Sequence, residues 1–342
     1  MRGISRRSFH RLLGAGAWAA ACSKEQVLTL YNWGDYLAPE VATRFTAATG
    51  ARVTQDFFLA EAELAAKLRT GAGYDVVFPI DYIVSRLQRE GLLQAIDPAL
   101  PGLANLDPQV PPWRAKDGQI YALPYLWGTT GIGYDSERVE APRSWQALFD
   151  PRYAGRISVI DSKGDVFDQA LLAAGMDINS TDKQAIRARV FPMLRAQKAI
   201  LRAYDANPSR ALVRGETWIA QIDSGDLLRA QAERPSLRYV IPDEGAVMWV
   251  DYAAIPAAAA DPALARRFLE LLLDPEIAAI NANTLRYATP NRAAIERGLV
   301  DGTDDPQLYP PPAARARLFT SENWFGNTES LVDSLWFELR SG

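Results

Sequence analysis

The side chains that could do chemistry in this sequence are carboxylates and aromatic rings rather than histidines or thiols. The chain has one histidine and one cysteine, His10 and Cys22. Beyond Cys22 there is therefore no Ser-His or Cys-His nucleophile, no imidazole base, no histidine-ligated zinc and no disulfide framework. Any chemistry in the remaining chain must use Asp, Glu, Tyr, Lys or Arg.

One aromatic residue and one acid stand two positions apart in a strand-like segment. Residues 246–256 read AVMWVDYAAIP, and period-two alternation places Trp249 and Asp251 on one face while Val250 points to the other. An aromatic face attracts a cation through its quadrupole, and a carboxylate forms a charge-assisted hydrogen bond with it. This pair is suited to the wall of a cleft for a cationic ligand.

The charge balance points to the same kind of ligand. The net charge is -4 over 342 residues, but the first 21 residues hold four arginines and no acid. The rest carries 33 basic and 41 acidic residues, a net charge of -8. An acidic chain without a basic run repels nucleic acid and anionic lipid headgroups. A cationic solute is the better electrostatic match.

The N-terminal segment has the features of an export signal. Residues 5–9 read SRRSF and are followed by LLGAGAWAAAC, which resembles a twin-arginine signal with an apolar run too short for a permanent membrane span. The stretch Ala19 to Cys22 resembles a lipobox, although Ala19 occupies a position that is usually Leu. Cleavage at an Ala-x-Ala site, leaving an unmodified Cys22, is the alternative. Residues 1–22 thus predict export to the periplasm or the outer face of the cytoplasmic membrane, with Cys22 lipidated.

The remaining chain alternates strand-like and helix-like segments. The first half predicts strands at 27–33, 52–58 and 74–80 and helices at 39–50, 60–71 and 82–93. This alternation is typical of βαβ units with a largely parallel sheet and helices on both faces. The runs 119–127 and 131–135 meet at Gly128-Thr129-Thr130-Gly131, a junction that can be a hinge.

The second half repeats the alternation and then returns to the first part. We expect strands at 155–161, 218–223 and 246–256, and helices from Val166, at 181–204, 262–274, 275–284 and 329–339. The prediction is an α/β protein of two lobes with a cleft between them, where strand ends and helix N-termini converge. We expect 27–129 with 251–295 in the first lobe, and 130–250 with 296–342 in the second.

Five segments resemble one family, the bacterial periplasmic spermidine- and putrescine-binding proteins of ABC transporters. In chain order they are LYNWGDYL, GYDVVFPIDYIVSRLQREGLLQAID, YALPYLWGTTGIGYD, WVDYAAIP and YATPN. The resemblance runs from Leu28 to the C-terminus. It implies a type II periplasmic binding protein fold, a polyamine ligand and a membrane permease as partner. It also implies a monomer that has no catalytic residues, metal or cofactor and binds no nucleic acid.

The resemblance also implies a set of ligand-binding residues. The matching aromatic residues are Trp33, Tyr36, Tyr82, Trp249 and Tyr287, and the matching acids are Asp35, Asp165, Asp226 and Asp251, with a looser match at Glu322. The sequence departs from the pattern at Ser162, where spermidine-binding members have an acid, and at Asp223, where members usually have Trp. Asp223 is a further candidate, and the choice between putrescine and spermidine stays open.

Other interpretations of these residues remain. Asp165 could be a helix N-cap or first-turn acid, Asp226 a solvated helix residue, and Asp223 part of a salt bridge. Paired carboxylates with aromatic platforms also occur in secreted glycoside-active enzymes. The same fold could instead bind ferric ion, thiamine, a sugar or an amino acid derivative. The sequence lacks the adjacent tyrosines typical of ferric sites, and the matched positions include no Arg for an amino acid carboxylate.

Overall fold

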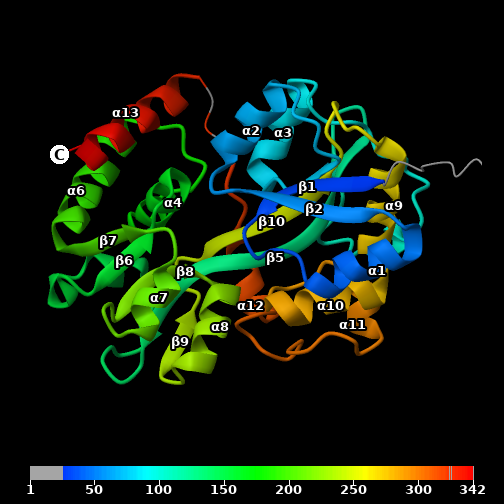
Figure 1. Ribbon diagram of the computed structural model, residues 1–342. Helices are drawn as coiled ribbons and strands as arrows, with labels where there is room; N and C mark the ends of the chain where they lie inside the picture. The colour runs from blue at the N-terminus through cyan, green and yellow to red at the C-terminus, as the bar shows by residue number, and fades with distance from the viewer. Residues whose placement is uncertain (1–25, 323, 325, 342) are drawn as a thin grey trace, which may run out of the picture.

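The computed structural model describes residues 26–322, 324 and 326–341, and it folds as two α/β lobes side by side (Figure 1). The predicted export signal and Cys22 lie outside these residues. Within the described part of the chain, no helix has both the length and the apolar character needed to cross a membrane. Two long strands run from one lobe into the other, so a single mixed sheet extends through the molecule.

The first lobe is built on three parallel strands, β1 (Val27–Trp33), β2 (Arg52–Phe58) and β3 (Val76–Val77). Its helices are α1 (Pro39–Thr49), α2 (Glu61–Arg69), α3 (Asp81–Arg89), α9 (Pro262–Leu272), α10 (Pro275–Leu285) and α11 (Arg292–Glu296). Helix α1 starts with proline, whose fixed φ suits the first helical turn, and ends at Gly50 in the left-handed region. The predicted strand at 74–80 is reduced to two residues.

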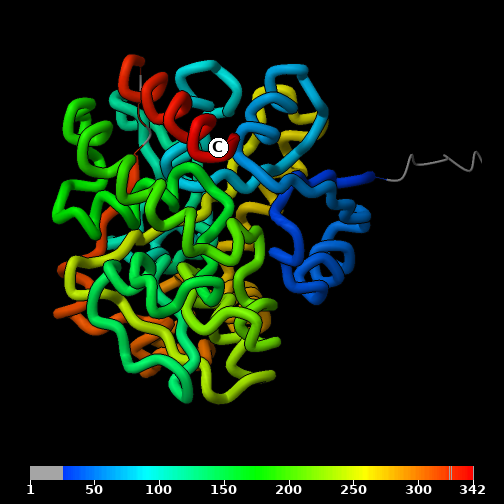
Figure 2. Tube along the Cα trace, turned by 90° about the vertical axis from the view of Figure 1, so that its left-hand side faces the viewer, coloured from blue at the N-terminus to red at the C-terminus, as the bar shows by residue number. Residues whose placement is uncertain are grey.

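The second lobe contains β6 (Ile157–Ile160), β7 (Leu201–Asp205), β8 (Ile219–Asp223) and β9 (Leu237–Val240). Helices α4 (Lys163–Ala173), α6 (Phe191–Ile200), α7 (Pro208–Val213), α8 (Ser224–Glu233) and α13 (Asn327–Ser341) cover it. Figure 2 looks onto this lobe, with α13 in red along its upper edge. Strands β6, β7 and β8 pair in parallel.

The helix predicted over 181–204 is wrong at both ends. The segment contains a short helix α5 (Lys183–Ala185), a π-helical turn over Ile186–Val190, and then α6. Pro192 has no N–H to donate, so the regular hydrogen-bond ladder is interrupted near this turn. The last four residues of the predicted helix lie in β7, because pairing with the buried strand β6 outweighs the helical pattern of the local sequence.

Strands β5 (Ile120–Asp135) and β10 (Ala246–Ala254) form the antiparallel crossover between the lobes. The junction at 128–131 does not break the chain into two strands, since β5 continues through it. Its glycines serve close packing instead. A Cβ at Gly128 would lie 2.5 Å from the ring of Trp249, and one at Gly131 would lie 2.6 Å from the hydroxyl of Tyr239. Only glycine allows both aromatic rings to pack against this strand.

The hydrophobic cores indicate which lobe each segment packs with, and so they can be compared with the lobe boundaries expected from the sequence. Leu28, Phe78 and Phe268 belong to one first-lobe core, and Ile157, Phe167 and Leu335 belong to a second-lobe core. Val300 and Leu308 belong to cores made mainly of first-lobe residues. We therefore propose that the segment 296–309 belongs to the first lobe, while α13 stays with the second.

Candidate ligand-binding site

Three of the predicted aromatic residues form one buried cluster in the first lobe. Tyr36 follows β1, Trp249 lies in β10, and Tyr287 follows α10. The ring centroids of Tyr36 and Tyr287 are 5.7 Å apart, and those of Trp249 and Tyr287 are 5.2 Å apart, both in edge-on geometry. Trp249 and Val250 belong to different cores, so the predicted alternation along β10 is confirmed. The cluster provides apolar ring surface beside charged residues.

Asp251 lies against this aromatic cluster and has unused hydrogen-bonding capacity. The Tyr36 hydroxyl donates to its Oδ2 at 2.7 Å. The indole of Trp33 is close enough to favour the charged carboxylate. Nevertheless, within the described chain, neither Trp33 Nε1 nor Asp251 Oδ1 has a hydrogen-bond partner, and both atoms are buried. Burial raises the pKa of Asp251 to about 7, against the lowering effect of Tyr36 and Trp33. A cationic donor would satisfy this carboxylate.

The second lobe contributes Asp223 and Asp165. Asp223 ends β8 and accepts hydrogen bonds at Oδ1 from Trp249 Nε1 at 3.1 Å and from Thr130 Oγ1 at 2.6 Å. Burial, followed by the charges of Asp226 and Asp165, raises the pKa of Asp223 to about 8. Asp165 lies in the first turn of α4, where Ser162 is the N-cap, and burial raises its pKa. The acid at the position usually held by Trp therefore lies inside the site.

Asp226 is in the site region but already has a cationic partner. Arg229, one turn later in α8, forms an ion pair with Asp226 and also donates to the Leu285 carbonyl. The Tyr287 hydroxyl donates to Asp226 at 2.8 Å, and the Arg229 guanidinium lies 5.1 Å from the centre of the Tyr287 ring. This group connects the start of α8 to the first lobe. Asp226 is therefore poorly placed to serve as the principal partner of a ligand cation.

Tyr82 lies among acids from both lobes. Burial raises the pKa of its hydroxyl most, and the charges of Glu61, Asp165, Asp81 and Asp168 raise it further. These four carboxylates belong to α2, α3 and α4. The position of Tyr82 in the structure is thus consistent with the predicted role.

Two predicted residues are not brought into the site. Asp35 is exposed in the turn after β1 with φ of 53°, a conformation that Asp tolerates better than most residues. Glu322 is exposed, and its backbone N–H donates to Asn179 at 2.7 Å. The structure therefore gives neither residue a contact with the aromatic cluster or with Asp251.

Three further acids matched no expected pattern in the sequence, namely the buried Glu61 and Asp168 and the half-buried Asp81. Asp81 starts α3, and its carboxylate accepts from the N–H groups of Tyr82 at 2.6 Å and Val250 at 3.3 Å. Burial raises its pKa to about 8, and Asp251 adds to this effect. Asp168 stands one helical turn after Asp165, a spacing that could have indicated a shared face. Glu61 gave no such signal, because only folding places it beside β10.

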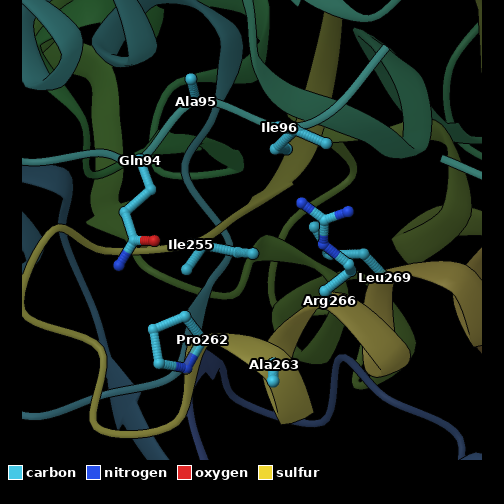
Figure 3. A pocket seen from close by; sticks show the side chains of 8 residues that line it. All are labelled: Gln94, Ala95, Ile96, Ile255, Pro262, Ala263, Arg266 and Leu269. Carbon is cyan, nitrogen blue, oxygen red and sulfur yellow. The ribbon is translucent and has the colours of Figure 1, made fainter. Parts of the chain in front are cut away.

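A separate surface pocket lies on the first lobe between the end of β10 and α9 (Figure 3). It has a volume of about 270 Å³, and its lining includes Gln94, Ile255 and Arg266. Arg266 pairs with Asp97 at 3.2 Å, so its charge is compensated. None of the aromatic or acidic site residues lines this pocket. We do not assign it to the ligand.

Comparison with known proteins places the chain among transport receptors. Residues 40–310 match the family model for bacterial extracellular solute-binding proteins. The chain belongs to this family. This solute-binding protein is 30% identical to the spermidine/putrescine-binding periplasmic protein of Salmonella typhimurium over 96% of each chain. It is also 30% identical to the putrescine/cadaverine-binding protein of Pseudomonas aeruginosa, over 95% of this chain and 96% of that one.

A solved structure supports the two-lobed fold directly. The spermidine/putrescine ABC transporter substrate-binding protein of Streptococcus pneumoniae superimposes with a TM-score of 0.79 at 27% identity, covering 92% of this chain and 99% of that one. The expected type II periplasmic binding protein architecture is therefore confirmed. The family is one of solute-binding proteins.

Gly225 of the second lobe lies against Tyr287 of the first, so a larger side chain at this position should keep the two lobes further apart. Gly225 is the second residue of α8, and a Cβ there would clash with the Tyr287 ring and lie 2.7 Å from the Arg286 carbonyl oxygen. We expect Gly225→Ala to weaken ligand binding by about 1 to 3 kcal/mol, the usual cost of overpacking. Calorimetry measures the affinity, and small-angle scattering should show a larger radius for the liganded variant.

Gly164 offers a matched control for this substitution. It is also the second residue of a second-lobe helix, α4, but a Cβ there would meet only Ser162 Oγ, at 3.8 Å. Gly164→Ala should therefore keep the wild-type affinity and radius. If Gly225→Ala binds as tightly as Gly164→Ala, the contact between α8 and Tyr287 does not limit the approach of the lobes.

Proposed function

We propose that this solute-binding protein captures a polyamine between its two lobes and delivers it to the membrane permease of an ABC importer. The observation that carries the proposal is the combination of the buried, partly unsatisfied Asp251 and two half-buried acids with a buried aromatic cluster. Asp251 and the rings of Tyr36 and Tyr287 come from the first lobe, and Asp165 and Asp223 come from the second. Such a set of residues is suited to a flexible cation with several charges.

The two kinds of side chain match the two parts of a polyamine. Each ammonium group loses water on binding and needs a carboxylate, because a buried charge without a partner costs several kcal/mol. The methylenes between the ammonium groups need apolar contact, which aromatic faces provide together with about 0.5 to 2 kcal/mol of cation attraction per ring. Closure of the lobes would then exclude water and present a distinct form to the permease.

The names of the relatives suggest the length of the ligand. The Salmonella relative is named for spermidine and putrescine, and the Pseudomonas relative for putrescine and cadaverine. All three are linear aliphatic amines. We therefore propose a linear diamine or triamine as the ligand, held without covalent change, and assign the protein no enzymatic activity.

The cellular location and state of the protein follow from this proposal. We propose an exported protein of the periplasm or outer face of the cytoplasmic membrane, acting as a monomer. The twin-arginine pair and the stretch before Cys22 support export and lipidation of that cysteine. A membrane tether of this kind would keep the receptor close to its permease.

Calorimetry of the purified mature chain tests the function. The titrants are putrescine, cadaverine, spermidine, a neutral sugar and an amino acid. We expect saturable binding of one or more of the amines, a change in tryptophan fluorescence, and a rise in melting temperature from binding to the folded state only. Binding of the sugar or amino acid instead, or no response to millimolar polyamine, would contradict the proposal. Turnover of a glycoside substrate would contradict the non-enzymatic assignment.

A further inference from the structure

Three carboxylates of the first lobe converge on one short backbone bridge. Ile80 and Asp251 form an isolated antiparallel bridge between the segment after β3 and strand β10. The Ile80 N–H donates to Glu61 Oε1 at 3.0 Å, which fixes the first residue of α2 at this bridge. The Val250 N–H donates to Asp81 Oδ2 at 3.3 Å. Backbone hydrogen bonds therefore hold Glu61, Asp81 and Asp251 around the same two strands.

The hydrogen bonding of this triad is incomplete. Glu61 is 7% exposed and Asp251 is 6% exposed. Glu61 Oε2 and Asp251 Oδ1 are buried and have no hydrogen-bond partner within the described residues. A charged carboxylate would leave these oxygens without donors, and a protonated one would leave its hydroxyl without an acceptor. Neither protonation state satisfies the buried atoms, so the triad is suited to an additional group that donates hydrogen bonds.

An acid of the second lobe lies within electrostatic range of Asp81. Asp168 in α4 is 3% exposed, and its Oδ1 also has no hydrogen-bond partner within the described residues. Burial raises its pKa well above the usual range, and the charges of Asp165 and Asp81 raise it further. Asp81 therefore acts electrostatically on Asp168 across the lobe boundary.

The negative charge at the two ends of the site is compensated differently. At one end Asp226 is paired with Arg229. The ion pairs found in the described residues include none for Glu61, Asp81, Asp168 or Asp251. A ligand cation should therefore be attracted most strongly to the end formed by these four acids.

The chemistry of the triad identifies the group that fits it. No set of described acids is arranged to hold a metal ion. A primary ammonium group has three N–H donors, whereas a secondary ammonium group has two. We propose that Glu61, Asp81 and Asp251 together bind one terminal ammonium group of the ligand. This inference rests on the proposed function and adds a charged end pocket to it.

Isosteric amide variants test the end pocket. Glu61→Gln and Asp81→Asn keep the side-chain size and the backbone-accepting oxygen but remove the charge. We expect each to weaken binding of putrescine by at least about tenfold, as for loss of one buried charge partner. Glu63→Gln is the matched control, because Glu63 is on the same helix but exposed, and it accepts from the Tyr31 hydroxyl at 3.1 Å. It should bind within about twofold of wild type.

A second measurement separates binding from structural support. Removing a buried, uncompensated charge should not lower the melting temperature of the ligand-free protein. Calorimetry near neutral pH in two buffers of different ionisation enthalpy should show that wild type releases protons on binding and that both variants release fewer. If one variant fails to fold, the affinity and proton release of the other variant decide the question.

Each remaining outcome has a defined meaning. If wild type binds no amine, the proposed function fails. If wild type binds but Glu61→Gln and Asp81→Asn bind equally well, or if wild type releases no protons, the end pocket alone is wrong. A lower melting temperature with unchanged proton release would assign the triad a structural role. Stabilisation of the ligand-free protein by calcium or magnesium, lost in both variants, would identify a metal as the occupant and overturn the ammonium assignment.

Discussion

Asp251→Asn is expected to weaken polyamine binding by about 2 to 4 kcal/mol, the range for truncating one partner of a buried charge pair. Asp251 is 6% exposed, and its Oδ1 is buried without a partner among the described residues, so it is available to a ligand cation. The amide keeps the size of the side chain and an oxygen for the Tyr36 hydroxyl, which donates at 2.7 Å in wild type. The substitution therefore removes mainly charge. Calorimetric titration with putrescine and spermidine measures the effect.

Asp243→Asn is the control for this variant. Asp243 lies just before β10 and pairs with Arg143 at 2.9 Å, but its side chain is 59% exposed, so solvent already screens its charge. We expect wild-type affinity in the control and no loss of ligand-free stability in Asp251→Asn. Equal affinities of Asp251→Asn and wild type would remove Asp251 from the site and, with it, the central contact of the proposed function.

The second large effect concerns pH. As the pH rises, the affinity for the ligand should increase and the stability of the ligand-free protein should decrease. Burial raises the pKa of Asp251 to about 7 and those of Asp81 and Asp223 to about 8. A bound cation favours the charged carboxylates, while aliphatic ammonium groups stay charged up to about pH 10. Binding should therefore release protons, and affinity should rise from about pH 6 to about pH 8.5. Calorimetry across this range tests the slope.

The ligand-free protein should show the opposite trend in stability. In the unfolded chain these carboxylates ionise at about pH 4, so between about pH 4 and pH 8 the folded state binds more protons than the unfolded state. The free energy of unfolding should therefore fall as the pH rises through 7 to 8, where the folded-state pKa values lie. Scanning calorimetry without ligand should show this fall, and saturating polyamine should reduce it.

Variants with fewer buried acids provide the control for both trends. Asp81→Asn removes one group whose pKa burial raises to about 8. Its melting temperature should depend less on pH than that of wild type, and its affinity should rise less steeply. A wild-type affinity that stays constant or falls over the same interval would show that these carboxylates do not meet the ligand in their charged form.

Several properties of this protein follow from the sequence alone. The absence of His and Cys after Cys22 excludes Ser-His and Cys-His nucleophiles and histidine-ligated zinc, because these need an imidazole or a thiol wherever the chain places it. The spacing of Trp249 and Asp251 places both on one face of β10, because side-chain direction in a strand alternates regardless of the surrounding fold. The order of strands and helices, and so the fold class, follows from similar local patterns. These features depend on residue types or on residues that are neighbours in the chain.

Tertiary structure decides which acids are buried, paired or exposed. Asp226 matched the expected pattern but is paired with Arg229, while Asp35 and Glu322 are exposed. Glu61 and Asp81 matched no expectation, yet they lie at the bridge between Ile80 and Asp251. The state of a carboxylate depends on desolvation and on partners within a few ångströms. Those partners come from segments far apart in the chain, so no local pattern determines them.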